Sequence, residues 1–367
     1  MAVKTKWWHT ESNTVVCTLC PRECHIPNDS RGFCFVRANV DGELKLTTDG
    51  RSSGFCIDPI EKKPLNHFLP GTSILSFGTA GCNLGCKFCQ NWDISKSRDM
   101  DRLMDEAPPE AIAEAALQTG CRSVAYTYND PVIFFEYALD VAAACRARRV
   151  KNVAVSAGYI CPDPRAEFYA AMDAVNVDLK AFTESFYKSL CSAELEAVKE
   201  TLIYIKHETD VWLEITTLLI PGENDSEAEI EALTQWVMQS LGPDVPLHFS
   251  AFHPNYKMTD KPNTPAETLI RAWRIARKNG VRYAYTGNIN NKETSSTYCH
   301  QCGLRLIGRD WYELSDWQLT VDGACPRCGT VCAGRFDGKP GNWGRKRQPV
   351  QMKQFAAAMH NSLAPAH

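Results

Sequence analysis

The chain has 367 residues, of which 44% are hydrophobic and 23% charged, and its formal net charge is −3. This length and apolar content are enough for one barrel-sized domain or for two or three smaller ones. The balanced charge gives no basic field for nucleic acid, and no apolar run reaches the ~18 residues of a membrane-crossing helix, so a disordered, fibrous, transmembrane or nucleic-acid-binding protein is not expected.

Seventeen cysteines are the unusual feature of the composition. Twelve of them fall into three groups, and the first nine residues lack the apolar stretch of a secretory signal. A chain of this length does not need disulfides to fold, and the cytosol keeps thiols reduced. Clustered thiols in a reduced compartment are better explained as ligands of soft metals or iron–sulfur clusters. The composition therefore predicts a cytoplasmic metal protein.

Residues 1–70 form a Cys-rich N-terminal segment with little sustained periodicity. Within 18 residues it holds a complete set of four thiols. Such a set can bind a structural zinc ion or an auxiliary iron–sulfur cluster, and the spacing does not separate the two. We favour a closed structural site, while a cluster there could relay electrons or donate sulfur. The four thiols are Cys17, Cys20, Cys24 and Cys34.

Residues 71–291 form a core in which short β-rich runs alternate with amphipathic helical stretches. This alternation is typical of an α/β fold with a parallel sheet, and six or seven such units predict a full or partial (β/α) barrel. The reactive groups of a barrel lie at the C-terminal ends of its strands. The expected strands are Ser73–Gly78, Ser123–Tyr128, Asn152–Ser156, Ala174–Leu179, Val211–Ile220, Pro246–Phe252 and Val281–Thr286; the expected helices include Pro131–Arg149, Ala193–Glu208, Ser226–Ser240 and Pro265–Asn279.

Three cysteines, Cys82, Cys86 and Cys89, follow the first of these strands directly. Three thiolates within eight residues can wrap one small cluster, with Gly85 easing the tight turns. A 4Fe–4S cluster normally takes four thiolates, so three local ligands leave one iron open to bind a reactant. The alternative, a structural zinc site, usually needs four ligands and prefers paired Cys-x2-Cys knuckles.

The spacing Cys-x3-Cys-x2-Cys, with Phe88 before the third cysteine, resembles the radical S-adenosylmethionine (radical SAM) superfamily. Over most of residues 17–332 the chain also resembles the AmmeMemoRadiSam-system radical SAM proteins, which are relatives of the pyruvate formate-lyase activating enzymes. The motifs that carry this resemblance are Cys17-Thr-Leu-Cys-Pro-Arg-Glu-Cys24, Asp58-Pro-Ile-Glu-Lys-Lys-Pro-Leu65, Gly81–Trp92, Thr127-Tyr-Asn-Asp-Pro131, Asn176-Val-Asp-Leu-Lys180, Thr216-Thr-Leu-Leu-Ile-Pro-Gly222 and Tyr256-Lys-Met258.

The resemblance implies a partial (β/α) barrel of the radical SAM type, with a 4Fe–4S cluster and S-adenosylmethionine as cofactors. The open iron would chelate the amino and carboxylate groups of S-adenosylmethionine. One electron, from a donor such as flavodoxin or ferredoxin, would then yield methionine and a 5′-deoxyadenosyl radical, which would abstract a hydrogen atom from the substrate. The cofactor carries this chemistry, and the protein supplies ligation, orientation and exclusion of water.

The same resemblance implies cofactor contacts at the strand ends, besides Phe88. Asp130 would lie near the methionine ammonium group, although it could also cap the helix that starts at the following proline. Ser156 would reach the ribose or the carboxylate. Asp178 and Lys180 would meet the cofactor together, or could merely pair with each other. His253 follows the sixth strand at the mouth of the barrel, where it could equally be a structural residue.

Residues 292–367 are expected to form a Cys-paired metal module and a polar tail. Two Cys-x2-Cys pairs, each followed by a glycine, favour a small zinc-ribbon-like or rubredoxin-like site over a nucleic-acid-binding module. The charged segment 344–347 is expected to be solvated, and the aromatic pair Trp311 and Tyr312 receives no role. The four thiols are Cys299, Cys302, Cys325 and Cys328.

The leading hypothesis is a radical SAM oxidoreductase that acts on a metabolite or a peptide. Alternatives are an activase of a glycyl-radical enzyme, a sulfur-inserting enzyme with an auxiliary cluster, and a non-catalytic iron–sulfur or zinc protein. A cluster with an open iron is poorly suited to simple electron transfer, which weighs against the last alternative. No catalytic residue and no membrane partner is assigned, and the substrate is left open.

Overall fold

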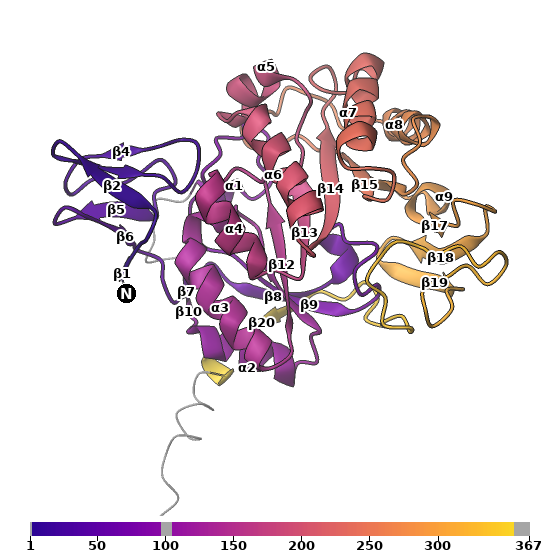
Figure 1. Ribbon diagram of the computed structural model, residues 1–367, viewed down its shortest axis with the longest axis horizontal. Helices are drawn as coiled ribbons and strands as arrows, with labels where there is room; N and C mark the ends of the chain where they lie inside the picture. The colour runs from indigo at the N-terminus through magenta and orange to yellow at the C-terminus, as the bar shows by residue number, and fades with distance from the viewer. Residues whose placement is uncertain (1, 97–104, 356–367) are drawn as a thin grey trace, which may run out of the picture.

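Seven parallel strands form the centre of the molecule, and each pairs with the strand that follows it in the sheet order (Figure 1). The computed structural model describes residues 2–96 and 105–355. Within these residues the sheet is open, because its edge strands β16 and β20 do not pair with each other. The predicted partial (β/α) barrel is therefore confirmed, with all seven expected strands. They are β9 (Ser73–Phe77), β11 (Ser123–Tyr126), β12 (Lys151–Ser156), β13 (Ala174–Asp178), β14 (Trp212–Leu219), β15 (Leu247–Ala251) and β16 (Ala284–Gly287).

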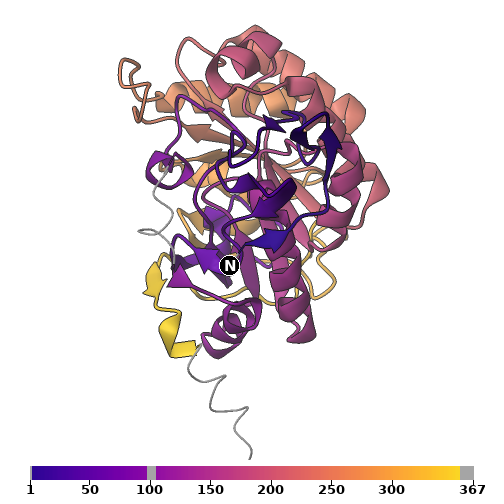
Figure 2. The ribbon, with the colours of Figure 1, turned by 90° about the vertical axis from the view of Figure 1, so that its left-hand side faces the viewer.

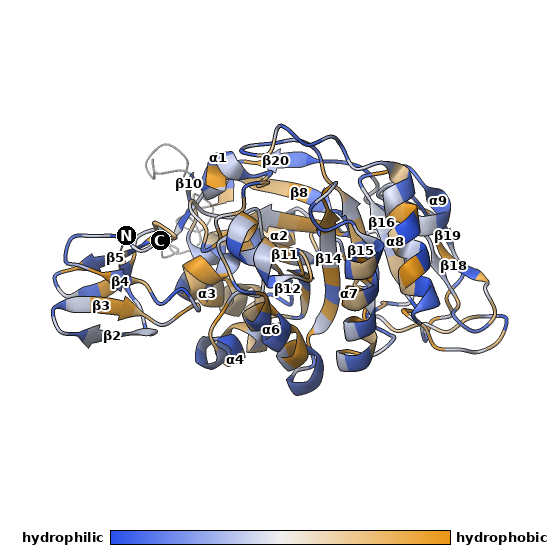
Figure 3. Cartoon of the chain, turned by 90° about the horizontal axis from the view of Figure 1, so that it is seen from above, coloured by the Kyte–Doolittle hydropathy of each residue, from blue (hydrophilic) through white to orange (hydrophobic). Residues whose placement is uncertain are grey.

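Amphipathic helices cover the outside of this sheet (Figure 3). In α6 the buried residues Val198, Leu202 and Ile205 recur every three or four positions, so one face of the helix packs inward. All five residues of β9 are buried, as is typical of a parallel strand covered on both faces. The helical segments between the strands are α2 (Pro109–Gln118), η2 (Pro131–Phe134), α3 (Phe135–Ala147), α4 (Pro162–Ala170), α5 (Glu184–Phe186), η3 (Tyr187–Cys191), α6 (Leu195–Glu208), α7 (Glu227–Ser240) and α8 (Ala266–Lys278).

Two antiparallel strands that the sequence did not predict extend one edge of the sheet. They are β8 (Phe55–Pro59), which pairs with β9, and β20 (Gln348–Val350), which pairs with β8. Both are short and contain a proline, which weakens the sequence signal for a strand. Because β20 comes from the C-terminal part of the chain, that part returns to the barrel beside the segment before β9.

The N-terminal segment forms two small antiparallel sheets at one end of the barrel (Figure 2). The sequence showed no periodicity here because these strands have only two to four residues each. A two-stranded pair, β7 (Arg51–Ser52) with β10 (Asp105–Glu106), and the short helix η1 (Ile60–Lys62) complete this part of the chain. The sheet strands are β1 (Val3–Lys4), β2 (Trp8–Glu11), β3 (Thr14–Cys17), β4 (His25–Ile26), β5 (Arg37–Val40) and β6 (Glu43–Leu46).

A C-terminal module lies at the opposite end of the barrel (Figure 1). It contains α9 (Lys292–Ser295) and a three-stranded antiparallel sheet of β17 (Thr297–Tyr298), β18 (Arg305–Asp310) and β19 (Glu313–Trp317). Its small core includes two tyrosines from the last barrel segment, Tyr283 and Tyr285, so the module is anchored to the barrel. The end of the expected polar tail, residues 356–367, lies outside the described residues. No described helix is both long and apolar enough to cross a membrane.

Candidate active site

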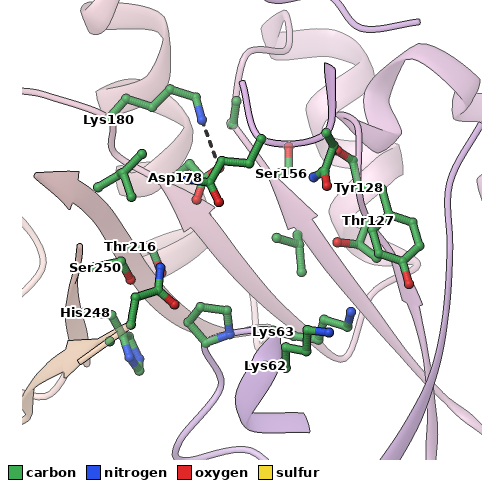
Figure 4. Close-up of a pocket in the computed structure, with 18 of the residues that line it drawn as sticks. Lys62, Lys63, Thr127, Tyr128, Ser156, Asp178, Lys180, Thr216, His248 and Ser250 are labelled. Carbon is green, nitrogen blue, oxygen red and sulfur yellow. Dashed lines mark hydrogen bonds and ion pairs between the residues drawn. The ribbon is translucent and has the colours of Figure 1, made fainter. Parts of the chain in front are cut away.

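A cavity of about 570 Å³ opens at the C-terminal ends of the parallel strands (Figure 4). Its wall consists of the loop after β9, residues of the other parallel strands or of the loops that follow them, and residues of the η1 segment and of the C-terminal part of the chain. This end of a (β/α) barrel is the one that carries reactive groups. Small-molecule sites occupy roughly 300–1,000 Å³, so the cavity has the size of a ligand site.

Cys82, Cys86 and Cys89 all line this cavity, on the loop that follows β9. The hydroxyl of Ser95, in the short helix α1 (Trp92–Ser95), lies 3.0 Å from the sulfur of Cys89. Among the described residues, a group of cysteines whose sulfur atoms all lie within 4.8 Å of one another is found in the C-terminal module, and the triad is not part of it. Around one tetrahedral zinc ion the sulfurs would be about 3.8 Å apart. Three thiols on one short loop can instead ligate a cluster with a metal–sulfide core.

The cysteine loop is held against the end of the π-helical turn η3. The amide of Gly85 donates to the carbonyl of Cys191 (2.7 Å), and the amide of Lys87 donates to the carbonyl of Leu190 (2.9 Å). We expected Gly85 to ease a tight turn, but its φ is not positive. A Cβ at this position would instead meet the Ser192 hydroxyl at 2.6 Å. Glycine is therefore needed here because the two backbones approach closely.

The electrostatic environment of the triad is uneven. Burial, with the nearby Asp130 carboxylate, raises the pKa of the Cys82 thiol to about 12. A hydrogen bond with Cys191, together with the charge of Lys180, lowers the pKa of the Cys86 thiol despite its burial. A thiolate that is removed from water requires a compensating positive charge, so a bound metal suits Cys82 and Cys86.

Asp130 and Ser156 meet in the wall of the cavity. One carboxylate oxygen of Asp130 accepts a hydrogen bond from the amide of Val132 (3.0 Å), and the other accepts one from the amide of Ala157 (2.9 Å). The Ser156 hydroxyl donates to the first of these oxygens at 3.1 Å. Asp130 thus caps η2, the structural role that the sequence left open, and it also faces the cavity.

Asp178 and Lys180 form an ion pair on the neighbouring strand end, because β13 pairs with β12, with Nζ to Oδ2 at 2.9 Å (Figure 4). The same ammonium group lies 6.0 Å from the centre of the Phe88 ring. Burial opposes its charge, but Asp178 and Cys86 raise the pKa of Lys180 well above its usual value. The pairing foreseen from the sequence is therefore present, and it keeps a cation beside the cysteine loop.

His253 lies outside this cavity. Its side chain is exposed, and its Nδ1 lies 3.2 Å from the amide oxygen of Asn263. The histidine that lines the cavity is His248, whose Nε2 lies 2.7 Å from a carboxylate oxygen of the buried Glu214. The sequence drew attention to the residue after the strand, whereas His248 is inside β15 and points inward because of strand alternation.

Three cations that the sequence did not assign line the cavity near Asp58, at the end of β8. The Asp58 carboxylate accepts hydrogen bonds from the ammonium groups of Lys62 (3.1 Å) and Lys63 (2.8 Å). Nε of Arg347 is 3.8 Å from the same carboxylate. Three cations and one carboxylate leave this wall positively charged. The side chain of Arg347 is nevertheless 65% exposed, in agreement with the expectation that this charged segment is solvated.

Two further polar side chains support the site. Asn129 donates to the carbonyl of Gly81 (2.7 Å) and accepts from the amide of Thr79 (3.2 Å), which ties the loop after β9 to the loop after β11. The hydroxyl of Thr216 is buried, lines the cavity and has no hydrogen-bond partner among the described residues. A ligand with a polar group could satisfy it. Both residues belong to motifs quoted from the sequence, but neither was singled out.

The thiols of the C-terminal module lie close enough to share one ion, because all four sulfurs are within 4.8 Å of one another. Gly303 and Gly329 have φ values of +71° and +73°, as the predicted knuckle turns require. The group fits a tetrahedral metal site, and zinc as its occupant is a prediction. The same module places Trp311 and Tyr312 in the wall of the large cavity. The four thiols are Cys299, Cys302, Cys325 and Cys328.

The four N-terminal thiols do not reach the large cavity. They line a smaller, separate cavity next to the N-terminal sheets, which face the viewer in Figure 2. Its other lining residues are mostly apolar. The four thiols are Cys17, Cys20, Cys24 and Cys34.

Comparisons with known proteins agree with this geometry. The family model of the radical SAM superfamily matches residues 77–233. An uncharacterized protein of Methanocaldococcus jannaschii is 39% identical over 327 residues, which are 89% of this chain and 96% of that protein. Among solved structures, a radical SAM methyltransferase from Sphaerobacter thermophilus is 15% identical, with 78% of this chain and 76% of that chain covered and a TM-score of 0.48. A domain of a pyruvate-formate lyase-activating enzyme from Bacteroides vulgatus is 17% identical, with 45% and 99% covered and a TM-score of 0.41.

Proposed function

The chain belongs to the radical SAM superfamily, and we propose that it holds a 4Fe–4S cluster on Cys82, Cys86 and Cys89 and binds S-adenosylmethionine beside it. When bound, these two groups supply an electron and a cleavable sulfonium, which give methionine and a 5′-deoxyadenosyl radical able to take a hydrogen atom from a substrate. The observation that carries the proposal is the convergence of three thiols on one ligand-sized cavity at the reactive end of the barrel.

The chain's own residues then bind and orient the cofactor. Lys180 lies on the cysteine-loop side of the cavity and keeps its positive charge, so it suits a carboxylate. Asp130, held rigidly by its hydrogen bonds, places negative charge near Cys82, where an ammonium group would be favoured. Ser156 and the unpartnered hydroxyl of Thr216 offer polar contacts along the wall, and Phe88 offers an apolar one.

The substrate that we propose is a metabolite or short peptide with an anionic group. Lys62, Lys63 and Arg347 share the single carboxylate of Asp58, so together they carry more positive than negative charge, and Lys62 and Lys63 lie across the cavity from Lys180 (Figure 4). Trp311 and Tyr312 of the C-terminal module also line the cavity, where they reduce the access of water to the reacting groups. An external low-potential donor, such as flavodoxin or ferredoxin, would deliver the electron.

Binding of S-adenosylmethionine tests this proposal against a non-catalytic iron–sulfur or zinc protein. The anaerobically reconstituted protein should retain the labelled cofactor in equilibrium dialysis, and the cofactor should change the electron paramagnetic resonance spectrum of the reduced cluster. The triple variant Cys82→Ala/Cys86→Ala/Cys89→Ala should lose both responses. The control variant Cys145→Ala, at a buried thiol within α3, should keep them. Absence of binding to the iron-loaded wild-type protein would contradict the proposal.

A further inference from the structure

The N-terminal cysteines come together although they lie on different parts of two small sheets. Cys17 ends β3, the next two cysteines lie in the connection to β4, and Cys34 lies shortly before β5. The amide of Cys17 donates to the carbonyl of Cys24 at 3.0 Å, which draws the two arms of the β3–β4 connection together. All four thiols line one cavity whose remaining wall includes Leu19 and Ile133. The site is therefore nearly dry and offers thiols as its main ligands.

The spacing of these thiols differs from that of the C-terminal group. In the C-terminal group Sγ of Cys299 is 3.5 Å from Sγ of Cys328, close to the roughly 3.8 Å expected around one tetrahedral zinc ion. No three of the N-terminal thiols have sulfurs that all lie within 4.8 Å of one another, although all four are described and share one cavity. Thiolates that surround a cubane stand further apart than thiolates around one ion, because the metal–sulfide core lies between them.

A buried cation completes the site. The Arg37 guanidinium lines the cavity and is 1% exposed. Burial opposes its charge, but Glu136 and, to a smaller extent, Cys17 and Cys34 raise its pKa above the usual value. Glu136 pairs with it at 2.5 Å from the far side. Glu136 balances the charge of this arginine, which in turn places a guanidinium beside thiols that would be negatively charged when they ligate a metal.

We propose that Cys17, Cys20, Cys24 and Cys34 hold a second 4Fe–4S cluster, with all four irons ligated by the protein. From the sequence we favoured a closed structural site and left zinc and an iron–sulfur cluster open. The site does not depend on the proposed cleavage of S-adenosylmethionine, because none of its ligands lines the large cavity.

The second site adjoins the central cysteine loop. A Cβ atom on Gly81 would lie only 2.0 Å from the carbonyl oxygen of Cys34. The backbone that carries Cys34 therefore contacts the cysteine loop at the residue before Cys82. Nε of Arg22 donates to the carbonyl of Asn83 at 3.1 Å, and Asn83 itself lines the N-terminal cavity. A residue in the wall of one site is thus the direct sequence neighbour of Cys82, a ligand of the other. This position makes the second cluster a neighbour of the first rather than a remote structural centre.

The decisive experiment replaces the three central cysteines and measures the iron and sulfide that the protein still binds. The triple variant Cys82→Ala/Cys86→Ala/Cys89→Ala, purified and reconstituted without oxygen, should hold about four irons and about four inorganic sulfides per chain, and the wild type about eight of each. Mössbauer spectra of the triple variant should show a cubane. Sulfide is counted because a rubredoxin-like C-terminal site would bind iron without it. A triple variant that contains two zinc ions, or iron without sulfide, would overturn the proposal.

A second pair of variants keeps the test independent of folding and of activity. Cys24→Ala/Cys34→Ala should lose half of the wild-type iron and sulfide but keep the central cluster. Cys161→Ala should lose none, although this thiol lies close to Cys17, because it does not line the cavity. If the double variant does not fold, the triple variant still decides. Because only metal and sulfide are measured, failure of S-adenosylmethionine cleavage would leave the result unchanged.

Discussion

Cys191 is a buried thiol that contacts the central cysteine loop from outside it. It forms a hydrogen bond with Cys86, and burial raises the pKa of the Cys191 thiol well above its usual value, so it remains a protonated donor. Hydrogen bonds to cluster sulfurs are among the features that set the reduction potential of a cluster. A bond from Cys191 stabilises the more negative, reduced state.

Replacing Cys191 by alanine should therefore make the potential of the central cluster more negative while the iron content stays near that of the wild type. The measurement is an anaerobic redox titration followed by electron paramagnetic resonance. Cys121→Ala, which removes a buried thiol outside the cavity, is the matched control. An unchanged potential in the Cys191 variant would show that this thiol only fills space.

Glu61 should make stability depend on pH. Burial raises the pKa of its carboxyl to about 7, even though the Arg309 guanidinium acts in the opposite direction. Between pH 4.5 and 7 the folded chain keeps a proton that the unfolded chain has lost, so stability falls as the pH rises through this window. Glu61→Gln should remove this fall, worth roughly 3 kcal/mol between pH 5 and pH 8.

Urea unfolding at the two pH values measures the effect. The exposed residue Glu200 provides the control, since Glu200→Gln should retain the wild-type dependence on pH. If the free energies of unfolding of the wild type and of Glu61→Gln change equally with pH, the fall in stability is not caused by this carboxyl.

At the scale of residues, the sequence predicted those arrangements whose members lie close together along the chain. The cysteine triad and the pair of Asp178 and Lys180 lie within short segments, and their arrangement follows from one loop and one strand. Arg347 faces a cavity whose other residues come from far earlier in the chain. No local pattern could show this, because the pairing of β20 with β8 decides where that arginine lies.

At the scale of elements, the cysteine loop and the turn η3 act as a fitted pair. A Cβ on Gly85 would lie 2.6 Å from the hydroxyl oxygen and 2.9 Å from the Cβ of Ser192. Gly85→Ala should therefore displace the loop, at a cost of about 1–3 kcal/mol for overpacking, and lower the amount of iron at the central site. Iron and sulfide counts after anaerobic reconstitution measure the loss.

The second residue of this pair provides a rescue. Ser192 has a φ of +53°, which glycine adopts readily, so Ser192→Gly removes both obstructing atoms without new strain. The double variant Gly85→Ala/Ser192→Gly should recover the wild-type iron content. If it does not, then flexibility of the loop, and not its close approach to η3, is the reason for the glycine.

The helices and strands also differ in how well the sequence predicted them. The seven core strands and four long helices could be predicted, because buried parallel strands give continuous apolar runs and the helices have regular apolar periodicity. The N-terminal strands could not, because two to four residues are too few to establish a period. Their apolar residues, such as Val15, Leu44 and Leu46, are buried in the main core, but each strand is too short for this pattern to stand out in the sequence.

At the scale of the whole molecule, the C-terminal module connects a metal site to the wall of the active site. Cys325→Ser/Cys328→Ser should remove about one zinc ion per chain and destabilise the protein by on the order of 4 kcal/mol, because metal binding and folding of such modules are coupled. Elemental analysis and thermal unfolding measure the two effects. Cys332→Ala changes a buried thiol of the same core and should keep the zinc; loss of zinc there would contradict the four-thiol assignment.

The most direct test of the radical chemistry is the cleavage of S-adenosylmethionine itself. Anaerobic protein with its cluster restored, given dithionite and S-adenosylmethionine, should form 5′-deoxyadenosine and methionine in equal amounts. The triple variant of Cys82, Cys86 and Cys89 should form neither. If the wild-type protein with a full complement of iron and sulfide produces no 5′-deoxyadenosine, radical SAM chemistry at this cavity is contradicted.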